Sequence, residues 1–244
     1  MKARIIFGIT LFLSLFIVIG CHKKDDPVPV QETGTVTDVE GNIYRTIKIG
    51  NQWWMAENLS VKMYRDGTFI PNITDSTSWA QNIAGAYCEY DNGNSQSAAP
   101  GLLYNWYAVN AAANIAPAGW HIPTDDEWRT LEQFIGMGQD ESAKSGWRGT
   151  HEGDKLKIES PKGWSTYHDV WSTNESGFAA MAGSCRLPNA TFGQPGLFST
   201  GFWWSHSETI GTDAWYRYLD YKNSNIFRSH DSKAYGFSVR CVKD

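Results

Sequence analysis

The residues whose types and spacing could do chemistry are short runs of acids and histidines. Residues 125–127 read Asp-Asp-Glu, residues 206–208 read His-Ser-Glu, and His151 precedes Glu152. A glycosidase needs two carboxylates facing each other across a bond, and three acids on one helix turn do not provide that, whereas capping of a helix explains them. A metal site needs a third ligand at a recognised spacing, which neither histidine pair has. The sequence therefore predicts no catalytic residue, no metal and no cofactor.

The N-terminus has the order of charged, apolar and small residues that is typical of a secretory signal. Lys2 and Arg4 precede an apolar run over residues 5–19, which is shorter than the about 20 residues of a membrane span. The run ends at Gly20-Cys21, which resembles a bacterial lipobox. We expect a signal peptide over 1–20, a lipidated Cys21 and a flexible tether over 21–34. An ordinary signal peptide that happens to contain a cysteine is the alternative.

The tether carries a further signal. Residues 22–26 read His-Lys-Lys-Asp-Asp, which resembles the surface-export signal of lipoproteins in the Bacteroidetes. A lipid on Cys21 would anchor the chain to a membrane without spanning it. The predicted location is therefore the outer membrane, with the lipid-anchored protein exposed at the cell surface. The alternative is a solvated tether whose charges carry no address.

The other three cysteines are Cys88, Cys185 and Cys241, which are far apart in the sequence and form no Cys-x-x-Cys pair. An exported protein meets oxidising surroundings, where one disulfide could form. The two pairings that we consider are Cys241 with Cys88 and Cys241 with Cys185. Three buried free thiols are the alternative.

Composition narrows the class of partner. Of the 244 residues, 41% are hydrophobic and 19% are charged, so the chain can bury a core. The formal net charge is -5, and removal of residues 1–20, which takes Lys2 and Arg4 with it, leaves -7. An acidic chain without a basic block argues against nucleic acid as the partner. Twelve tryptophans are typical of aromatic cores and of carbohydrate-binding surfaces.

Residues 35–244 show strand patterns at both ends and helix patterns between them. The capping box of Thr124 and Glu127 predicts a helix over 125–135, and Asp75 or Ser76 could cap a short helix that holds Trp79. Further segments complete this reading: a helix over 102–112; strands over 35–39, 43–49, 52–56, 155–158, 214–221, 225–228 and 236–242; polar breaks at 222–224 and 229–233; and a surface excursion over 136–153. No repeat or linker divides these residues, so we expect one α+β domain.

Several segments resemble the Fibrobacter succinogenes major paralogous domain (FISUMP). Among them are Gly-Trp-His-Ile-Pro-Thr at 119–124 and Gly-Phe-Ser-Val-Arg-Cys-Val at 236–242. The others are 36–38, 41–44, 49–52, 54–59, 101–106, 127–128, 174–178, 203–205 and 214–217. The resemblance covers about residues 34–243. It implies a secreted protein or lipoprotein, a group generally without an assigned biochemical function.

Residues 119–128 and 236–240 also resemble, more distantly, the formylglycine-generating enzymes. That resemblance implies a C-type lectin-like fold, with short antiparallel sheets, a few helices and long loops. Those enzymes use a closely spaced cysteine pair, which is absent from this chain. The departure removes the basis for carrying the oxidase activity over to it.

The aromatic residues of the last third fall into core candidates and contact candidates. We expect eight tryptophans to be core: Trp53, Trp54, Trp106, Trp120, Trp128, Trp203, Trp204 and Trp215. On strand alternation Tyr216 and Tyr218 share one face, but both faces of that strand carry aromatic residues. The candidate ligand-binding residues are Tyr218, Asn223, Asn225, Arg228, His230 and Asp231.

Three functions are compatible with these patterns. The first is a lipid-anchored surface module that binds a glycan or a protein, without catalysis, and whose oligomeric state the sequence leaves open. The second is a structural component of an envelope or fimbria-like assembly. The third, disfavoured by the missing cysteine pair, is an enzyme related to formylglycine-generating oxidases or acting on glycans.

Overall fold

Three sheets of antiparallel strands and five short α-helices make up the described part of the chain. The computed structural model describes residues 31–94, 100–159, 162–193 and 196–244. The predicted signal peptide, Cys21 and most of the predicted tether lie outside these residues. Gln31–Asp244 form one compact unit of mixed, sheet-dominated α+β class. Among the residues described, no helix is long and apolar enough to cross a membrane.

The first sheet joins the two ends of the compact unit. Its strand order is β1 (Thr33–Thr37), β2 (Ile43–Ile49), β3 (Gln52–Met55), β12 (Val242–Lys243) and β6 (Trp120–His121). The β1–β2 hairpin and β3 agree with the sequence prediction, because local turns set their register. Strand β12 pairs with β3 and with β6, so the C-terminal strand fills the gap between them.

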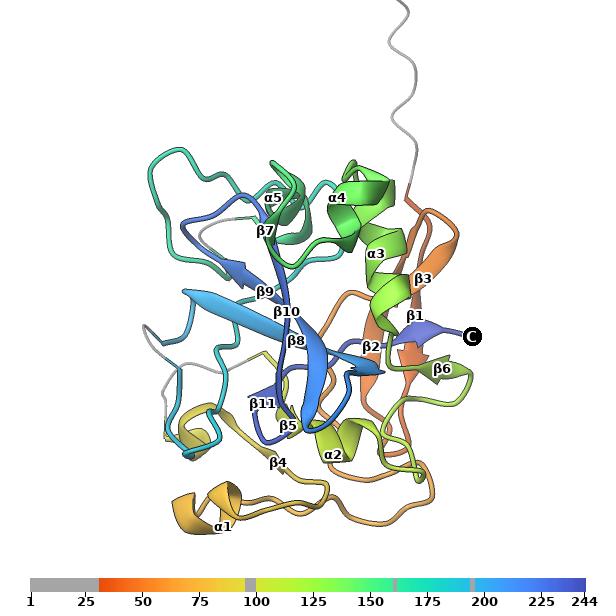
Figure 1. Cartoon of the computed structure of the whole chain (residues 1–244). Coiled ribbons are helices and arrows are strands. Elements are labelled where there is room, and N and C mark those ends of the chain that lie inside the picture. Colours follow the sequence, from red (N-terminus) through yellow and green to blue (C-terminus); the bar gives the residue numbers. More distant parts are fainter. Residues whose placement is uncertain (1–30, 95–99, 160–161, 194–195) are drawn as a thin grey trace, which may run out of the picture. The chain divides into compact units, whose positions relative to one another are not determined.

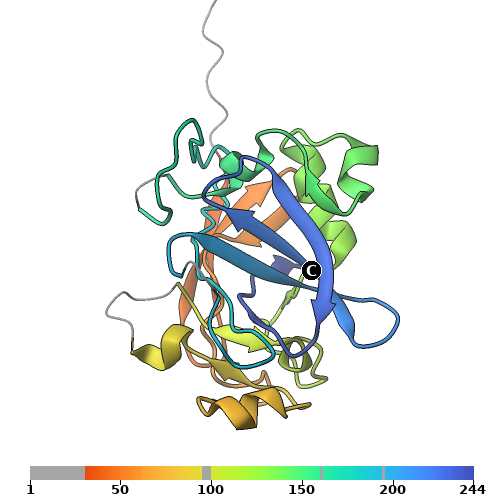
Figure 2. The same cartoon turned by 60° about the vertical axis from the view of Figure 1, so that its left-hand side comes forward.

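The second sheet has the order β7 (Gly146–Arg148), β10 (Ile226–Ser232), β9 (Asp213–Asp220) and β8 (Thr200–Glu208). In Figure 2 its blue strands lie in front of the orange strands of the first sheet. The predicted strand over 214–221 is confirmed. The predicted break over 229–233 is wrong, because residues 229–232 continue to pair with β9. The polar side chains of that stretch do not interrupt a backbone ladder whose partner strand is already in place.

The third sheet shows why two further predictions were wrong. Its order is β11 (Gly236–Phe237), β5 (Leu103–Asn105) and β4 (Tyr87–Cys88). The predicted helix over 102–112 is a strand followed by the short helix α2 (Trp106–Val109), which Asn105 caps by accepting from the backbone N–H of Ala108. The predicted strand over 236–242 is two strands, β11 and β12, that belong to different sheets.

The remaining helices are short. Helix α1 (Ser76–Ala80) is capped by Asp75, and α3 (Asp125–Phe134) has the predicted capping box of Thr124 and Glu127. The predicted excursion over 136–153 contains α4 (Gln139–Ala143) and β7. The predicted strand over 155–158 is wrong, because residues 155 and 156 end the helix α5 (Glu152–Leu156). Residues 90–93 form a 3-10 turn, η1 (Tyr90–Gly93).

Helix α3 lies between the four-stranded sheet and β3 (Figure 1). Trp128 of α3 packs against Trp54 of β3, with ring centroids 5.0 Å apart, and both share a core cluster with Trp203 of β8. Six of the eight tryptophans expected in the core are buried: Trp54, Trp106, Trp120, Trp128, Trp203 and Trp204. Trp53 and Trp215 are only half-buried, so for these two the prediction is wrong.

Candidate functional site

The four-stranded sheet has two chemically different faces, set by strand alternation. One face, the helix face, packs on α3 and carries Arg217 of β9, Arg228 of β10 and Arg148 of β7. The other, the aromatic face, carries aromatic side chains from all four strands. The register Phe227↔Tyr218 and Arg228↔Arg217 keeps like residues on the same face.

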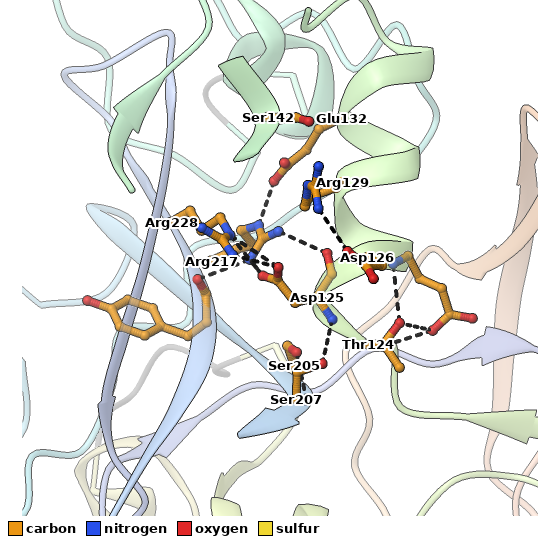
Figure 3. A network of polar contacts seen from close by, with 12 residues as sticks. Thr124, Asp125, Asp126, Arg129, Glu132, Ser142, Ser205, Ser207, Arg217 and Arg228 are labelled. Atoms are coloured by element: carbon orange, nitrogen blue, oxygen red, sulfur yellow. Dashed lines mark hydrogen bonds and ion pairs between the residues drawn. The ribbon is translucent and has the colours of Figure 1, made fainter. Parts of the chain in front are cut away.

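On the helix face a buried ionic network joins α3 to the sheet. Asp125 at the start of α3 accepts from Arg217 Nη1 at 2.7 Å and from Arg228 Nη2 at 2.7 Å. About two turns further along the helix, Glu132 accepts from Arg217 Nε at 2.5 Å and from Arg148 Nη1 at 2.7 Å. Figure 3 shows Asp125 and Glu132 reaching from the helix toward Arg217 and Arg228. The side chains of Glu132 and Arg148 are fully buried.

The network changes the interpretation of two residues. Asp125 is more than a helix cap, since it also carries the ion pairs to both strands. Burial by itself would raise the pKa of Asp125, but the hydrogen bond from Arg228 and the charge of Arg217 outweigh it and lower that pKa below its usual value. Arg228, predicted as an exposed ligand contact, is 7% exposed and belongs to this network. That prediction is therefore wrong.

On the aromatic face, neighbouring strands contribute rings that contact one another. The rings of Phe202 and Tyr218 are stacked, with centroids 4.5 Å apart. Trp147 lies 5.2 Å from both Tyr218 and Phe227. Trp147 is 40% exposed, and the other three are partly buried. We call Trp147, Phe202, Tyr218 and Phe227 the aromatic patch. Its partial exposure is the property that ligand-contacting aromatic residues need.

Polar groups border the aromatic patch. The Tyr218 hydroxyl donates to Asp220 Oδ2 at 2.5 Å, and burial together with that hydrogen bond raises the pKa of Tyr218 well above its usual value. Ser229 and Asp231 lie on the same face of β10 as Phe227, by strand alternation. The face therefore offers neutral rings beside carboxylate and hydroxyl groups.

The structure divides the six candidate ligand-binding residues among three places. Tyr218 and Asp231 lie on the aromatic face. Arg228 and His230 lie on the helix face, where His230 Nδ1 is 3.0 Å from Asp213 Oδ2 and the His230 ring contacts Trp215. Asn223 and Asn225 lie in the turn between β9 and β10.

That turn is anchored rather than free. Lys157 Nζ donates to the Asn223 carbonyl at 2.5 Å, and the Asn225 side chain donates to the Gly149 carbonyl at 2.6 Å. A Cβ on Gly153 of α5 would lie 2.4 Å from the Asn225 carbonyl oxygen, so the helix and the turn pack backbone to backbone. The side chain of Asn225 thus serves the fold, whereas Asn223 contributes only its backbone carbonyl, a distinction that the composition of the turn could not reveal.

Trp147, Phe202 and Phe227 belong to the aromatic patch but were not predicted from the sequence. Their signal was present only in part, because Phe227 alternates with Arg228 in the same way that Tyr218 alternates with Arg217. The sequence around Trp147 does not indicate that it belongs to this face, because β7 lies about 80 residues before its partner strand β10 in the chain.

The described part of the chain has no disulfide at the three remaining cysteines and no metal site at the histidine pairs. Cys88, Cys185 and Cys241 are buried free thiols, so neither expected disulfide is present. Burial raises the pKa of Cys88 to about 11 and that of Cys185 to about 12. Within the described ranges, no group of three or more histidine, cysteine or acidic side chains is placed to hold a metal ion.

His121 is a partly buried histidine whose two ring nitrogens both have carboxylate partners. Its Nδ1 is 2.6 Å from Asp244 Oδ1 and its Nε2 is 2.7 Å from Glu127 Oε1. Burial by itself would lower the pKa of His121, but the hydrogen bonds to Asp244 and Glu127 outweigh it, so that pKa is raised above its usual value. The contact ties the C-terminal residue to the start of α3.

These features define a sheet-rich α+β domain with a buried ionic network behind one sheet and an aromatic surface in front of it. A family model described as the Fibrobacter succinogenes major domain matches residues 47–243, and the chain belongs to this family. Comparison with the curated proteins and with solved structures gave no match.

Replacing Glu132 by glutamine tests the network. Glutamine keeps the shape of the side chain but removes the negative charge that Arg148 and Arg217 share in a buried site. We expect the variant to lower the free energy of unfolding by about 3–5 kcal/mol. Urea unfolding followed by tryptophan fluorescence measures the change. Asp126→Asn on the same helix is the control, since Asp126 is 84% exposed, and a loss as large as that of Glu132→Gln would contradict the role of burial.

The pKa of His121 predicts a pH dependence of stability. Because the pKa is raised in the folded state, the stabilisation is fully present below the unfolded value of about 6.5 and is lost as pH rises through the folded value. We expect the difference in unfolding free energy between the wild type and His121→Gln to be larger at about pH 5.5 than at about pH 9. His151→Gln, whose ring is 76% exposed, is the control. A difference that stays constant with pH, or grows toward pH 9, would rule the effect out.

Proposed function

We propose that this protein is a non-catalytic binding module, held at the bacterial surface by a lipid on Cys21, whose aromatic patch binds a glycan. The observation that carries the proposal is the patch itself. Four aromatic side chains from four strands form a connected cluster, centred on Tyr218, on one face of a sheet and stay partly exposed. Exposed aromatic clusters of this kind mark interaction sites in soluble domains.

The size and border of the patch favour sugar rings over a protein partner. A stable protein–protein interface uses about 20–30 residues on each side, whereas the patch has four rings. Aromatic rings offer flat apolar faces, and the neighbouring Asp220, Ser229 and Asp231 offer oxygen atoms that hydroxyl groups can bind. A glycan presents both kinds of surface at once.

The residues that sequence analysis weighed as catalytic support a binding role over turnover. Asp125 is engaged with Arg217 and Arg228, and Glu127 is engaged with Thr124 and His121. Carboxylates held in this way are already committed to structural contacts. The distance between the three cysteines in the sequence gives no support to oxidase chemistry of the formylglycine-generating type.

We further propose that the fold is a variant of the C-type lectin-like fold. In support, short antiparallel sheets are joined by long irregular segments, and the last strand returns to the sheet that the first strands form. The distant resemblance of residues 119–128 and 236–240 to the formylglycine-generating enzymes points the same way.

A glycan array probed with residues 31–244 tests the ligand. We expect binding to a subset of glycans, and Trp147→Ala should weaken it about ten-fold or more, which corresponds to ~1.4 kcal/mol, because Trp147 is the most exposed ring of the patch. Trp171→Ala is the matched control, since Trp171 is 71% exposed and contributes no ring to the patch. Folded protein that binds no glycan, or equal losses in both variants, would overturn the proposal. A protein ligand found on a parallel protein array, or co-purification with an envelope assembly, would favour the other functions.

Changing the predicted lipidation site tests the location. We expect Cys21→Ser to move the protein from the outer-membrane fraction to the soluble fraction, because a lipid chain supplies the membrane affinity. Cell fractionation and protease shaving of whole cells measure this, with Cys88→Ser as the control. Unchanged membrane association of Cys21→Ser would contradict the lipid anchor, and protection of the wild type from protease would contradict surface display.

A further inference from the structure

A cleft of about 390 Å³ opens beside strands β2 and β3, and no residue of the aromatic patch lines it. Its walls come from β2, from residues 56–60 that follow β3, from the segments around residues 100–101 and 179–181, and from Ile158 and Arg240. Cavities of about 300–1,000 Å³ are the usual size of small-ligand sites.

Arg240, one of the residues lining this cleft, is a buried cation held only by neutral groups. It is 1% exposed, and its guanidinium lies over the Phe178 ring, 4.1 Å from the ring centroid. Nε donates to Asn58 Oδ1 at 2.8 Å and Nη2 to the Ala179 carbonyl at 2.8 Å. Nη1 donates to the carbonyls of Phe178 and, at 3.4 Å, Met55. Among the residues that the structure describes, no carboxylate forms an ion pair with Arg240.

This arrangement leaves Arg240 without a directly paired carboxylate, since Glu57 attracts it only from a distance, and it leaves one N–H without a partner among the described residues. A guanidinium has five N–H groups, and the four contacts above use four of them. Burial is the main reason that the pKa of Arg240 is lowered, to about 9, so the side chain is still protonated at neutral pH. A buried cation without a directly paired counter-charge is costly for a fold, and an anion that enters beside it regains part of that cost.

The rim adds a second positive charge. Arg45 is 67% exposed, and its Nε lies 3.2 Å from Glu57 Oε1. The charged residues that line the cleft are therefore Arg45, Glu57 and Arg240, which gives the cleft a formal charge of +1 on a chain whose net charge is -5. The remaining lining mixes apolar side chains such as Met181 with amide and hydroxyl groups such as Ser60.

We propose that this cleft is a second ligand site, which binds the carboxylate of a small molecule or chain end through Arg240 and Arg45. A guanidinium binds carboxylates with charge-assisted hydrogen bonds, and the mixed apolar and polar walls suit the body of the ligand. The apolar part of the lining, which includes Ile43, Pro100 and Met181, favours the free C-terminus of a peptide, and a uronic acid residue of an acidic polysaccharide is the other outcome that the test can give. The site is independent of the aromatic patch and of its proposed glycan ligand.

Calorimetric titration of the full chain in detergent micelles tests the site with defined probes. One arm compares galacturonate with galactose, and the other compares acetyl-dialanine with its C-terminal amide. We expect at least one carboxylate to bind saturably at millimolar concentration and about ten-fold more tightly than its neutral counterpart, with affinity falling as salt is added. The arm that binds identifies the source of the carboxylate. Equal affinity within both pairs, or no binding of either carboxylate by folded protein, would overturn the proposal.

Variants at the rim avoid the risk of unfolding that a change at buried Arg240 carries. Arg45→Glu reverses an exposed charge and should weaken carboxylate binding by about ten-fold, because the repulsion acts at the entrance of the cleft. Lys144→Glu makes the same change of charge just after α4, outside the cleft, and should leave the affinity within about two-fold. Equal losses in the two variants would show a general effect of charge and sink the assignment. Trp147→Ala should leave carboxylate binding unchanged, so failure of the patch and failure of the cleft can be told apart.

Discussion

The pairing of buried charges between α3 and the four-stranded sheet is the constraint on which the rest of the structure depends. Three guanidinium groups from three strands converge on Asp125 and Glu132, and the side chains of Glu132 and Arg148 are fully buried. Breaking a buried ion pair costs far more than an exposed one, because the partner left behind stays desolvated. The network therefore fixes both the register of β9 against β10 and the position of the helix.

Fixing one face of a sheet also decides the other. Since successive side chains of a strand alternate, the arginines that point to α3 force Tyr218 and Phe227 to the opposite side. The same rule applies on β7, where Arg148 is buried and its neighbour Trp147 is exposed. The aromatic patch is thus a consequence of how the network is built, and a ligand on it would meet a rigid surface rather than a flexible loop.

The fold handles its buried arginines in two ways. Arg217 and Arg228 are neutralised by carboxylates, which leaves them no free charge to offer a ligand. Arg240 receives only neutral acceptors and borders a cleft. The first arrangement stabilises the contact between helix and sheet. Arg186 is also buried and also donates to carbonyls, those of Ile73, Thr74 and Ala190, but it does not line the cleft. The position of Arg240 beside the cleft, rather than its charge compensation alone, therefore marks the candidate site.

The sequence by itself determined what depends on near neighbours. The capping box of Thr124 and Glu127 sets the start of α3, local turns set the first strands, and recurring segments such as 119–124 pointed to the family. Only the tertiary structure decided what depends on distant partners. Arg228 looks like an exposed contact until Asp125, 103 residues away in the chain, accepts its hydrogen bonds. Strand alternation placed Tyr218 on one face of β9 but did not tell which face is exposed to solvent. That depends on which face of the sheet α3 covers.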